Sequence, residues 1–297
     1  MSRSFMEQEI ASQPECWQRA VELAGPAGSA AGPALPRPGR RVAVVGCGTS
    51  RFIAESYAVL RESTGLGHTD AFAASEFPRG RSYDELVAIT RSGTTTEVLR
   101  LLAEVRGRIP TTVITGVPGE VASRADTVVD LSFADERSVV QTRFATSTLA
   151  LLRAHLGERI DQAIAEAKTV LGAPVPAYLR SATQFTFLGT GWTVGIANEA
   201  ALKFREASLA WAESYPAWEY RHGPISISEP GRVTWMFGEP PAGLPADVRR
   251  AGGTFEASSL DPQAELVRAQ LAAAALAWDR GLDPDRPRSL TRSVVLH

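Results

Sequence analysis

Cysteine is scarce in this chain, with only Cys16 and Cys47 among its 297 residues. Two cysteines cannot build the disulfide framework of a small secreted domain. Cys47 lies between two glycines at the end of an apolar run, where we expect a small buried side chain rather than half of a disulfide. This use of cysteine fits a reducing compartment, and we predict a cytoplasmic protein.

Long apolar runs are also missing. No stretch approaches the ~18 uninterrupted apolar residues of a membrane-spanning helix. Residues 1–30 carry charge throughout and lack the apolar centre of a signal peptide. We therefore expect neither a leader nor a membrane segment.

An excess of one charge is absent as well. Lys and Arg number 31, Asp and Glu number 33, and the net charge is −2 at pH 7. This balance creates no field that attracts nucleic acid or an anionic membrane surface, so we expect a small partner. The sequence also lacks HExxH, paired CxxC motifs and carboxylate clusters with metal-ligand spacing, and we predict no metal site.

What the chain does have is an alternation of apolar runs and helical patterns. Residues 4–24 read as an amphipathic arm interrupted at Pro14, and the Pro- and Gly-rich stretch 25–39 reads as an exposed linker. Strand-like runs then follow at 42–45, 67–73, 86–89, 111–115 and 127–131, with helices between them and a closing helix at 139–156. Strands that are apolar on both faces are typical of the parallel, doubly wound sheet of an α/β protein.

A second half starts after Pro174 and Pro176, with a strand at 185–188, a helix at 196–207 and a strand at 233–237. Its Gly189-Thr190-Gly191-Trp192-Thr193 matches Gly46-Cys47-Gly48-Thr49-Ser50 at an offset of 143 residues. The match suggests duplicated α/β domains, although five residues can also match by chance. We expect an arm and linker (1–39), a first domain (40–172) and a second domain (173–297).

A hydroxyl-rich loop, Thr90 to Glu97, joins the strand at 86–89 to a helical pattern. The first turn of a helix has unpaired N–H groups and partial positive charge, both of which favour a phosphate. Hydroxyls of this loop can donate to phosphate oxygens, and Arg91 can neutralise charge. The alternative is structural, because Thr94 followed by Glu97 is also a capping box that merely starts a helix.

The turn at 46–50 invites a dinucleotide interpretation, but Arg51 occupies the third glycine position of the fingerprint. No acidic residue follows a clean strand at the distance needed for the ribose, and we predict no cofactor. Thr49 and Ser50 can still donate to a phosphate or a sugar hydroxyl. Both turns fall at carboxyl ends of strands, where open α/β sheets bind ligands.

Glu199, Lys203 and Glu206 are spaced i, i+4 and i+7, so a helix places them on one face. They form either an exposed ion-pair ladder or a catalytic group in which mutual charge tunes proton transfer. His222 lies in the stretch 212–224, which reads as an ordered loop rather than a strand. A single histidine can be structural or catalytic.

Together these stretches resemble the sugar isomerase (SIS) domain family, particularly the two-domain isomerase module of glucosamine-6-phosphate synthase. Residues 5–14 resemble the arm entering that module, 46–50 and 92–95 its sugar-phosphate turns, and 199–206 and 219–224 its catalytic helix and histidine loop. The resemblance implies two tandem flavodoxin-like SIS domains with parallel sheets and an N-terminal helical arm. It also implies a homodimer in which the histidine loop can reach the neighbouring subunit's site.

The resemblance further implies roles at matched positions. The residues that hold the phosphate and sugar are Thr49, Ser50, Thr90, Arg91, Ser92 and Thr95, together with Glu199 and Arg292. Glu206 moves a proton between C1 and C2 of the open-chain sugar, Lys203 stabilises the developing negative charge, and His222 assists ring opening.

Three departures from the synthase matter. Arg292 stands where the synthase carries a Schiff-base lysine, and a guanidinium cannot form that imine, although it can polarise a carbonyl or bind a hydroxyl. The sequence begins at its arm without a glutaminase domain, so we expect no glutamine-dependent synthase activity. Residues 136–142 are closer to the deaminating branch of the family.

We therefore predict a phosphosugar isomerase of the amino-sugar-phosphate deaminase/isomerase type, whose partner is a phosphorylated sugar or amino sugar. Two alternatives stay open. One is simple aldose–ketose isomerisation without loss of nitrogen. The other is a sugar-phosphate-binding protein without turnover.

Overall fold

The computed structural model describes residues 3–25 and 34–296, which fall into two compact units. The five-strand unit comprises Ser12–Ile160 and Thr291–His297, and the four-strand unit comprises Met1–Ala11 and Asp161–Leu290. The chain therefore crosses between the units near both ends. The change of unit after residue 160 precedes the expected boundary at 172, because α6 (Asp161–Leu171) packs against α10 (Pro262–Asp279) of the four-strand unit.

The sheet of the five-strand unit is parallel throughout, in the order β2-β1-β3-β4-β5. The strands are β1 (Val42–Gly46), β2 (Thr69–Ala73), β3 (Glu85–Thr90), β4 (Thr111–Thr115) and β5 (Thr127–Asp130). This confirms the predicted parallel sheet, and the order 2-1-3-4-5 is that of flavodoxin-type doubly wound folds. In such an order, the ligand crevice opens between the carboxyl ends of β1 and β3.

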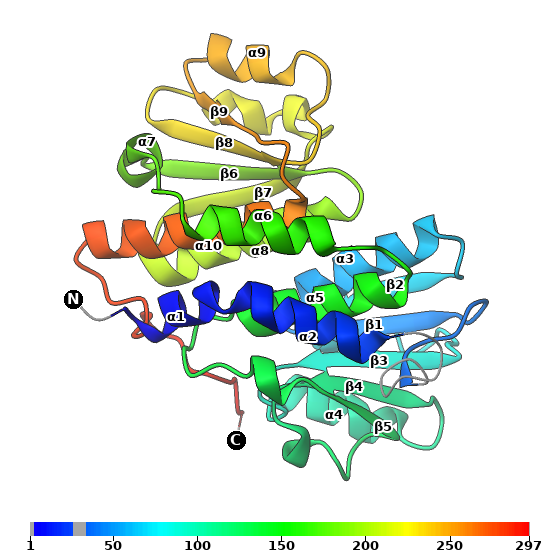
Figure 1. The fold of residues 1–297 in the computed structure, drawn as a ribbon. Helices are drawn as coiled ribbons and strands as arrows, with labels where there is room; N and C mark the ends of the chain where they lie inside the picture. The colour runs from blue at the N-terminus through cyan, green and yellow to red at the C-terminus, as the bar shows by residue number, and fades with distance from the viewer. Residues whose placement is uncertain (1–2, 26–33, 297) are drawn as a thin grey trace. The chain divides into compact units, whose positions relative to one another are not determined.

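Helices cover both faces of this sheet (Figure 1). They are α2 (Gln13–Ala24), α3 (Thr49–Ser63), α4 (Thr96–Val105) and α5 (Arg143–His155). Figure 1 shows α4 on one side of the sheet and α2, α3 and α5 on the other. Because helices lie on both faces, the continuous apolar strands of this sheet are buried on both faces, as the sequence pattern predicts.

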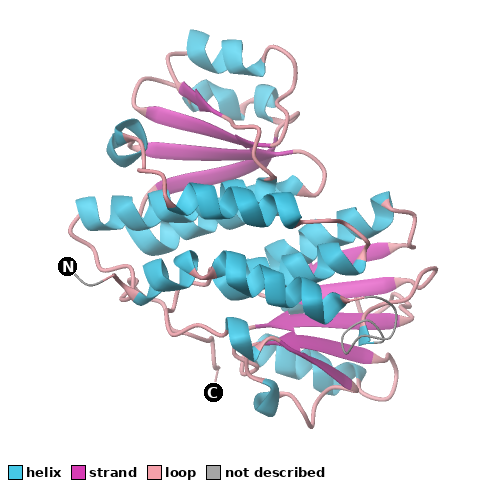
Figure 2. Cartoon of the chain, viewed as in Figure 1, coloured by secondary structure: helices cyan, strands magenta, loops and turns pink. Residues whose placement is uncertain are grey.

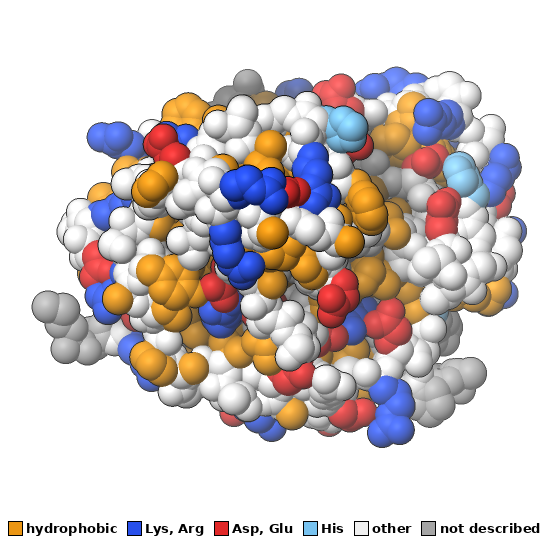
Figure 3. Space-filling view, turned by 90° about the horizontal axis from the view of Figure 1, so that it is seen from above, with side chains coloured by type: hydrophobic (Ala, Val, Ile, Leu, Met, Phe, Trp, Pro, Cys, Tyr) orange, Lys and Arg blue, Asp and Glu red, His pale blue; other side chains and the backbone are white. Residues whose placement is uncertain are grey.

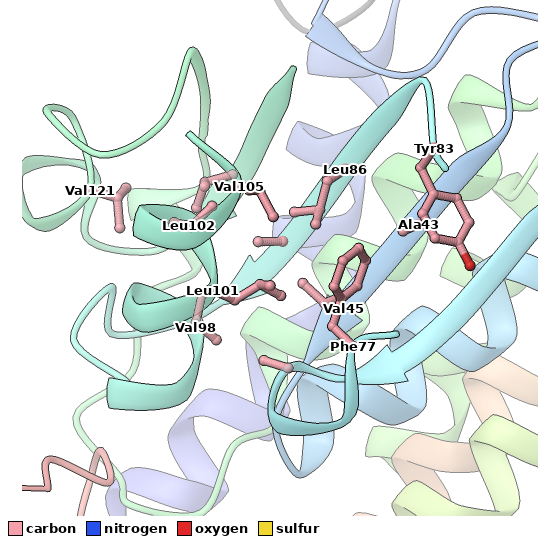
Figure 4. Close-up of a cluster of buried hydrophobic side chains, with 13 residues drawn as sticks. Ala43, Val45, Phe77, Tyr83, Leu86, Val98, Leu101, Leu102, Val105 and Val121 are labelled. Atoms are coloured by element: carbon pink, nitrogen blue, oxygen red, sulfur yellow. The ribbon is translucent and has the colours of Figure 1, made fainter. Parts of the chain in front are cut away.

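The core under α4 follows from the spacing of the apolar residues on this helix. Val98, Leu101, Leu102 and Val105 recur at i, i+3, i+4 and i+7, and all four are buried against strand residues such as Leu86. Figure 4 shows these side chains pointing toward one another between helix and strands. Burying each such side chain contributes about 1.5–3 kcal/mol, which fixes the start of α4 relative to the end of β3.

The four-strand unit also has a parallel sheet, in the order β7-β6-β8-β9. Its strands are β6 (Gln184–Gly189), β7 (Trp211–Pro216), β8 (Arg232–Phe237) and β9 (Thr254–Glu256). Its other helices are α1 (Phe5–Ala11), α7 (Ala177–Ser181), α8 (Thr193–Ser208) and α9 (Leu244–Arg250). Figure 2 distinguishes the helices from the strands of each sheet.

The sequence interpretation of 212–224 as loop is wrong for its first part, because Trp211–Pro216 is strand β7. This strand lies at the sheet edge and pairs only with β6 among the described strands. An edge strand needs no continuous apolar run, and Trp211 is 72% exposed. The helix predicted from 139 begins at Arg143 instead, because residues 136–142 form a loop.

The expected N-terminal arm consists of two helices that belong to different units. The carboxylate of Asp285 accepts hydrogen bonds from the backbone N–H groups of Phe5 (2.7 Å) and Met6 (3.0 Å), which holds α1 in the four-strand unit. In the five-strand unit, Trp17 Nε1 donates to Thr146 Oγ1 at 2.9 Å, which joins α2 to α5.

The expected exposed linker lies partly outside the described residues, at 26–33. Its described end is not fully exposed, since Leu35 and Pro36 are buried. Arg61 donates to the carbonyl oxygen of Arg37 at 2.8 Å, and Thr112 Oγ1 donates to that of Ala34 at 2.8 Å. These bonds attach residues 34–37 to the five-strand unit.

Surface charge is mixed, as the composition predicts. On the face drawn in Figure 3, acidic side chains lie among the basic ones. Among the helices that the structure describes, none combines the length and apolar character needed to cross a membrane.

Candidate functional site

The turn after β1 brings a helix directly against the strand end. A Cβ atom on Gly46 would lie 2.5 Å from the backbone carbon of Ser50, so only glycine permits this approach. Gly48 has φ +53°, and α3 starts at the next residue. The side chains of Thr49 and Ser50 are consequently buried in the first turn of α3, at the crevice end of the sheet.

The last residue of β3, Thr90, is buried in the same way, as are Arg91 and Ser92 in the loop that follows. The capping-box alternative is wrong, because α4 starts at Thr96 with Thr95 at its N-cap position and no side chain capping it. Thr94 Oγ1 instead contacts Ser92 Oγ at 3.1 Å. The hydroxyls of this loop are therefore not committed to starting the helix.

A small cavity of about 30 Å³ lies where these two turns meet. Its lining includes Ser50 from the first turn, Thr90, Ser92 and Thr95 from the second, and Gln141 from the loop before α5. The other lining residues are Cys47, Ile89, Arg91, Val98 and Arg292. Thus six of the predicted binding residues share one cavity, with Thr49 adjacent in the chain.

The hydroxyl of Thr90 is a candidate ligand-binding group in this cavity. Thr90 is 3% exposed, and its Oγ1 has no hydrogen-bond partner among the described residues. Buried polar atoms are rarely left without a partner in folded proteins. A donor that no protein atom uses is suited to a phosphate oxygen.

Arg91 links three segments around the cavity. Its guanidinium donates to the carbonyl oxygens of Ser138 (2.9 Å), Val139 (3.2 Å) and Arg292 (2.5 Å), and lies 3.8 Å from the carboxylate of Glu136. Its predicted contact with phosphate stays a prediction. The observed geometry adds a positioning role, because the guanidinium ties both the loop before α5 and the C-terminal tail to the end of β3.

The C-terminal tail lies on the hydroxyl-rich loop at 90–97. Ser293 Oγ is 3.1 Å from Ser92 Oγ and 3.0 Å from Thr94 Oγ1, and the N–H of Thr96 donates to the carbonyl oxygen of Val294 at 3.1 Å. This oxygen accepts a hydrogen bond from an N–H group in the first turn of α4. Such N–H groups are the donors that an anion uses at a helix start. The tail therefore covers the start of α4, where an anion would otherwise bind.

The side chain of Arg292 is held in the five-strand unit by a carboxylate and a backbone carbonyl oxygen. Its guanidinium pairs with the Asp135 carboxylate, and its Nε donates to the carbonyl oxygen of Glu136 at 3.1 Å. It lines the cavity as a fixed charged group, which agrees with a binding role better than with covalent chemistry.

Cys47 is a free thiol, and its side chain is half-buried rather than buried as the sequence predicts. Burial, reinforced by the charge of Glu97, raises the pKa of the Cys47 thiol to about 11. At pH 8 the thiolate is therefore about 10³-fold less abundant than the thiol.

We expect alkylation of Cys47 by iodoacetamide in a Cys16→Ala variant to be slow at pH 8 and to increase about tenfold per pH unit up to pH 10. Mass spectrometry of timed samples measures the rate. A rate that reaches half its maximum below pH 9 would contradict the burial argument.

Three predicted residues lie together on α8 in the four-strand unit. The Lys203 ammonium is 2.5 Å from Glu206 Oε2 and 3.5 Å from Glu199 Oε1. Lys203 and Glu199 are fully buried, whereas the Glu206 side chain keeps 19% of its surface exposed. The alternative of an exposed ion-pair ladder is therefore wrong. A buried ammonium sits beside a carboxylate that solvent or a substrate can reach.

The turn before α8 repeats the glycine geometry of the first turn. A Cβ atom on Gly189 would lie 2.2 Å from the carbonyl oxygen of Thr193, and Gly191 has φ +59°. The hydroxyl of Thr193, however, is used by the Thr190 N–H at 2.8 Å and the Phe237 carbonyl at 3.0 Å. The repeat noted in the sequence is thus structural, and its hydroxyl serves the fold.

His222 ends a short 3₁₀ helix, Tyr220–His222, and is exposed. Its neighbours anchor this segment: Tyr220 is buried, with its hydroxyl 3.2 Å from Thr234 Oγ1, and Arg221 pairs with Asp247 at 2.7 Å. The segment therefore holds the imidazole in a defined place on the surface of the four-strand unit.

Sequence reasoning missed several residues at the cavity. Gln141 lines it, Asp135 and Glu136 hold its arginines, and Ser293 contacts its hydroxyls. In the sequence, the stretch 136–142 shows only a resemblance to the deaminating branch. Within residues 3–25 and 34–296, no group of three or more His, Cys, Asp and Glu side chains is placed to hold a metal ion.

Comparison with known proteins confirms the resemblance. Residues 37–156 match the SIS domain family. The chain is 28% identical to the isomerizing glutamine–fructose-6-phosphate aminotransferase of Pyrobaculum aerophilum, over 98% of this chain and 57% of that protein. It therefore spans little more than half the length of this relative.

Solved structures give the same result. The glucosamine-6-phosphate deaminase of Thermotoga maritima superposes with a TM-score of 0.79 at 25% identity, covering 99% of this chain and all of that one. The tagatose-6-phosphate ketose/aldose isomerase of Escherichia coli has a TM-score of 0.80 at 19% identity, covering 99% and 97%, and shares the fold.

Proposed function

We propose that the protein is a phosphosugar isomerase of the amino-sugar-phosphate deaminase/isomerase type, because residues 37–156 match the SIS domain family. In this proposal the four-strand unit is a second SIS domain, preceded by the helical arm at the N-terminus. The substrate is an open-chain hexosamine 6-phosphate or a related fructosamine phosphate, and the enzyme is cytoplasmic.

The observation that carries the proposal is the pair of Lys203 and Glu206 on α8, 2.5 Å apart. Proton transfer between C1 and C2 needs a base that reaches the carbon acid, and a nearby cation that stabilises the enediol or enolamine. Glu206 is accessible enough to be the base, and Lys203 is held out of water, where its charge acts most strongly. Glu199 keeps the ammonium in place.

The hydroxyl-lined cavity of the five-strand unit supplies the handle for the phosphate. Ser50, Thr90, Ser92 and Thr95 present neutral donors, while Arg91 and Arg292 bring positive charge to the same lining. This combination suits a phosphomonoester dianion. We assign Thr49 to the same handle through its place in the first turn of α3.

We also propose a homodimer in which His222 of one subunit assists ring opening in the site of the other. Its exposed imidazole on an anchored segment is consistent with a residue that serves a neighbouring chain. The second candidate function is aldose–ketose isomerisation without loss of nitrogen, favoured by the fold shared with the tagatose-6-phosphate isomerase.

A substrate panel tests the proposal. Glucosamine 6-phosphate, galactosamine 6-phosphate and fructosamine 6-phosphate are incubated with the protein, and ammonia or amine release and the product sugars are measured. We expect release from at least one of them. Isomerised sugar without free amine selects the second function, and binding without turnover of any substrate contradicts both.

A further inference from the structure

The side chain of Gln141 is an unexplained feature of the cavity. It lines the cavity beside the hydroxyls of Thr90, Ser92 and Thr95. Its Oε1 is buried without a hydrogen-bond partner among the described residues. Together with the similarly unused Oγ1 of Thr90, it leaves one acceptor and one hydroxyl to be satisfied at the same place. Since buried polar atoms are normally paired, the cavity is built for a group that both accepts and donates.

The backbone on either side of Gln141 is held firmly. Glu136 Oε1 accepts from the N–H (2.5 Å) and hydroxyl (2.8 Å) of Thr142, and Ser138 Oγ donates to the carbonyl oxygen of Val140 at 2.7 Å. The residues before and after Gln141 are thus both fixed. The loop presents the Gln141 side chain to the cavity without depending on a bond from that side chain, so its oxygen is available to a ligand.

A phosphate group does not satisfy this oxygen. A phosphomonoester dianion offers acceptor oxygens only, and an amide oxygen also only accepts. The hydroxyls of Ser50, Thr90, Ser92 and Thr95 supply what the phosphate needs. The oxygen of Gln141 requires a hydrogen-bond donor. Close to the phosphate of a sugar phosphate, the only such donors are sugar hydroxyls.

We propose that Gln141 accepts a hydrogen bond from the hydroxyl on C5 of a hexose 6-phosphate and so selects the open-chain form of the sugar. C5 is the carbon next to the one that bears the phosphate. In the cyclic sugar the oxygen on C5 is the ring oxygen, which has no proton to donate. Ring opening converts it into a hydroxyl that Gln141 can accept from. This role rests on the proposed phosphosugar function and adds a residue to it.

The test is isothermal calorimetry with three probes. Glucitol 6-phosphate is permanently open and has the C5 hydroxyl, 1,5-anhydroglucitol 6-phosphate keeps a ring oxygen at C5, and inorganic phosphate has no sugar. We expect Gln141→Met to weaken binding of glucitol 6-phosphate ~5- to 10-fold. Binding of the other two probes should stay within about twofold of the wild type, because they make no such bond. Gln18→Met, at an exposed position on α2, is the matched control and should change none of them.

Each other outcome overturns the inference in a different way. An equal loss for all three probes places Gln141 on the phosphate or in the fold, and an unchanged affinity for glucitol 6-phosphate removes it from the site. If the wild type binds inorganic phosphate but neither sugar phosphate, the proposed function fails, and this inference with it.

A second variant keeps the test decisive if Gln141→Met does not fold. Gln141→Glu retains an accepting oxygen but adds a negative charge near the phosphate. We expect it to weaken all three probes while preserving the preference for glucitol 6-phosphate over the anhydro compound. Loss of that preference would contradict the role of the amide oxygen.

Discussion

Replacing Glu206 with Gln is expected to lower turnover by ~10²–10⁴-fold, the usual contribution of a general base. Gln has nearly the same size but cannot take up a proton. Glu206 lies at the end of the Glu199–Lys203–Glu206 row on α8, with its Oε2 2.5 Å from the Lys203 ammonium. Because Glu199 remains near that ammonium, at 3.5 Å, the variant should keep its fold.

Initial rates on whichever substrate the wild type converts measure this loss. Calorimetry with inorganic phosphate should give an unchanged affinity, since the proposed phosphate site is in the five-strand unit. Glu229→Gln is the matched control, because Glu229 also forms an i,i+3 pair, with Arg232, but is exposed. Turnover of Glu206→Gln within tenfold of the wild type would remove Glu206 from the mechanism.

Replacing Lys203 with Met is expected to lower the free energy of unfolding by about 3–5 kcal/mol. Lys203 and Glu199 are both fully buried, 3.5 Å apart. Without the ammonium, Glu199 keeps a buried charge that water cannot reach and that has lost the cation 3.5 Å from it. Urea denaturation at neutral pH measures the loss.

A double variant identifies the cause of the stability loss in Lys203→Met. Lys203→Met with Glu199→Gln removes both buried charges, so it should recover a measurable part of the stability lost by Lys203→Met alone. Neither variant should isomerise sugar, since both lack the cation. An additive loss in the double variant would show that packing, rather than uncompensated charge, accounts for the effect.

The five-strand sheet was predictable because its strands are apolar on both faces. The run Val42–Val45 and the glycine turn after it required a strand that leads straight into a helix, and the structure has both. The hydroxyls of Ser50, Thr90 and Ser92 could be expected at one edge, since carboxyl ends of parallel strands meet there. The cavity brings them together.

The remainder depended on contacts that local pattern does not encode. Strand β7 carries polar and exposed residues, because an edge strand is selected by pairing with β6 rather than by burial. Glu136 and Ser293 are far in sequence from the hydroxyl-rich loop at 90–97, whose Arg91 and Ser92 they contact. Such long-range pairs follow from tertiary packing, and nothing in the spacing of single residues indicates them.

The most direct measurement of the central claim is exchange of carbon-bound hydrogen with solvent. A hexosamine 6-phosphate or its ketose product is incubated with the protein in D₂O and followed by ¹H NMR at C1 and C2. A base that moves a proton between these carbons through an enediol or enolamine incorporates deuterium from solvent at one of them, even before net conversion is visible. We predict such incorporation with the wild type and its loss in Glu206→Gln. Binding of the sugar phosphates with neither deuterium incorporation nor conversion would contradict the assignment and leave a protein that only binds them.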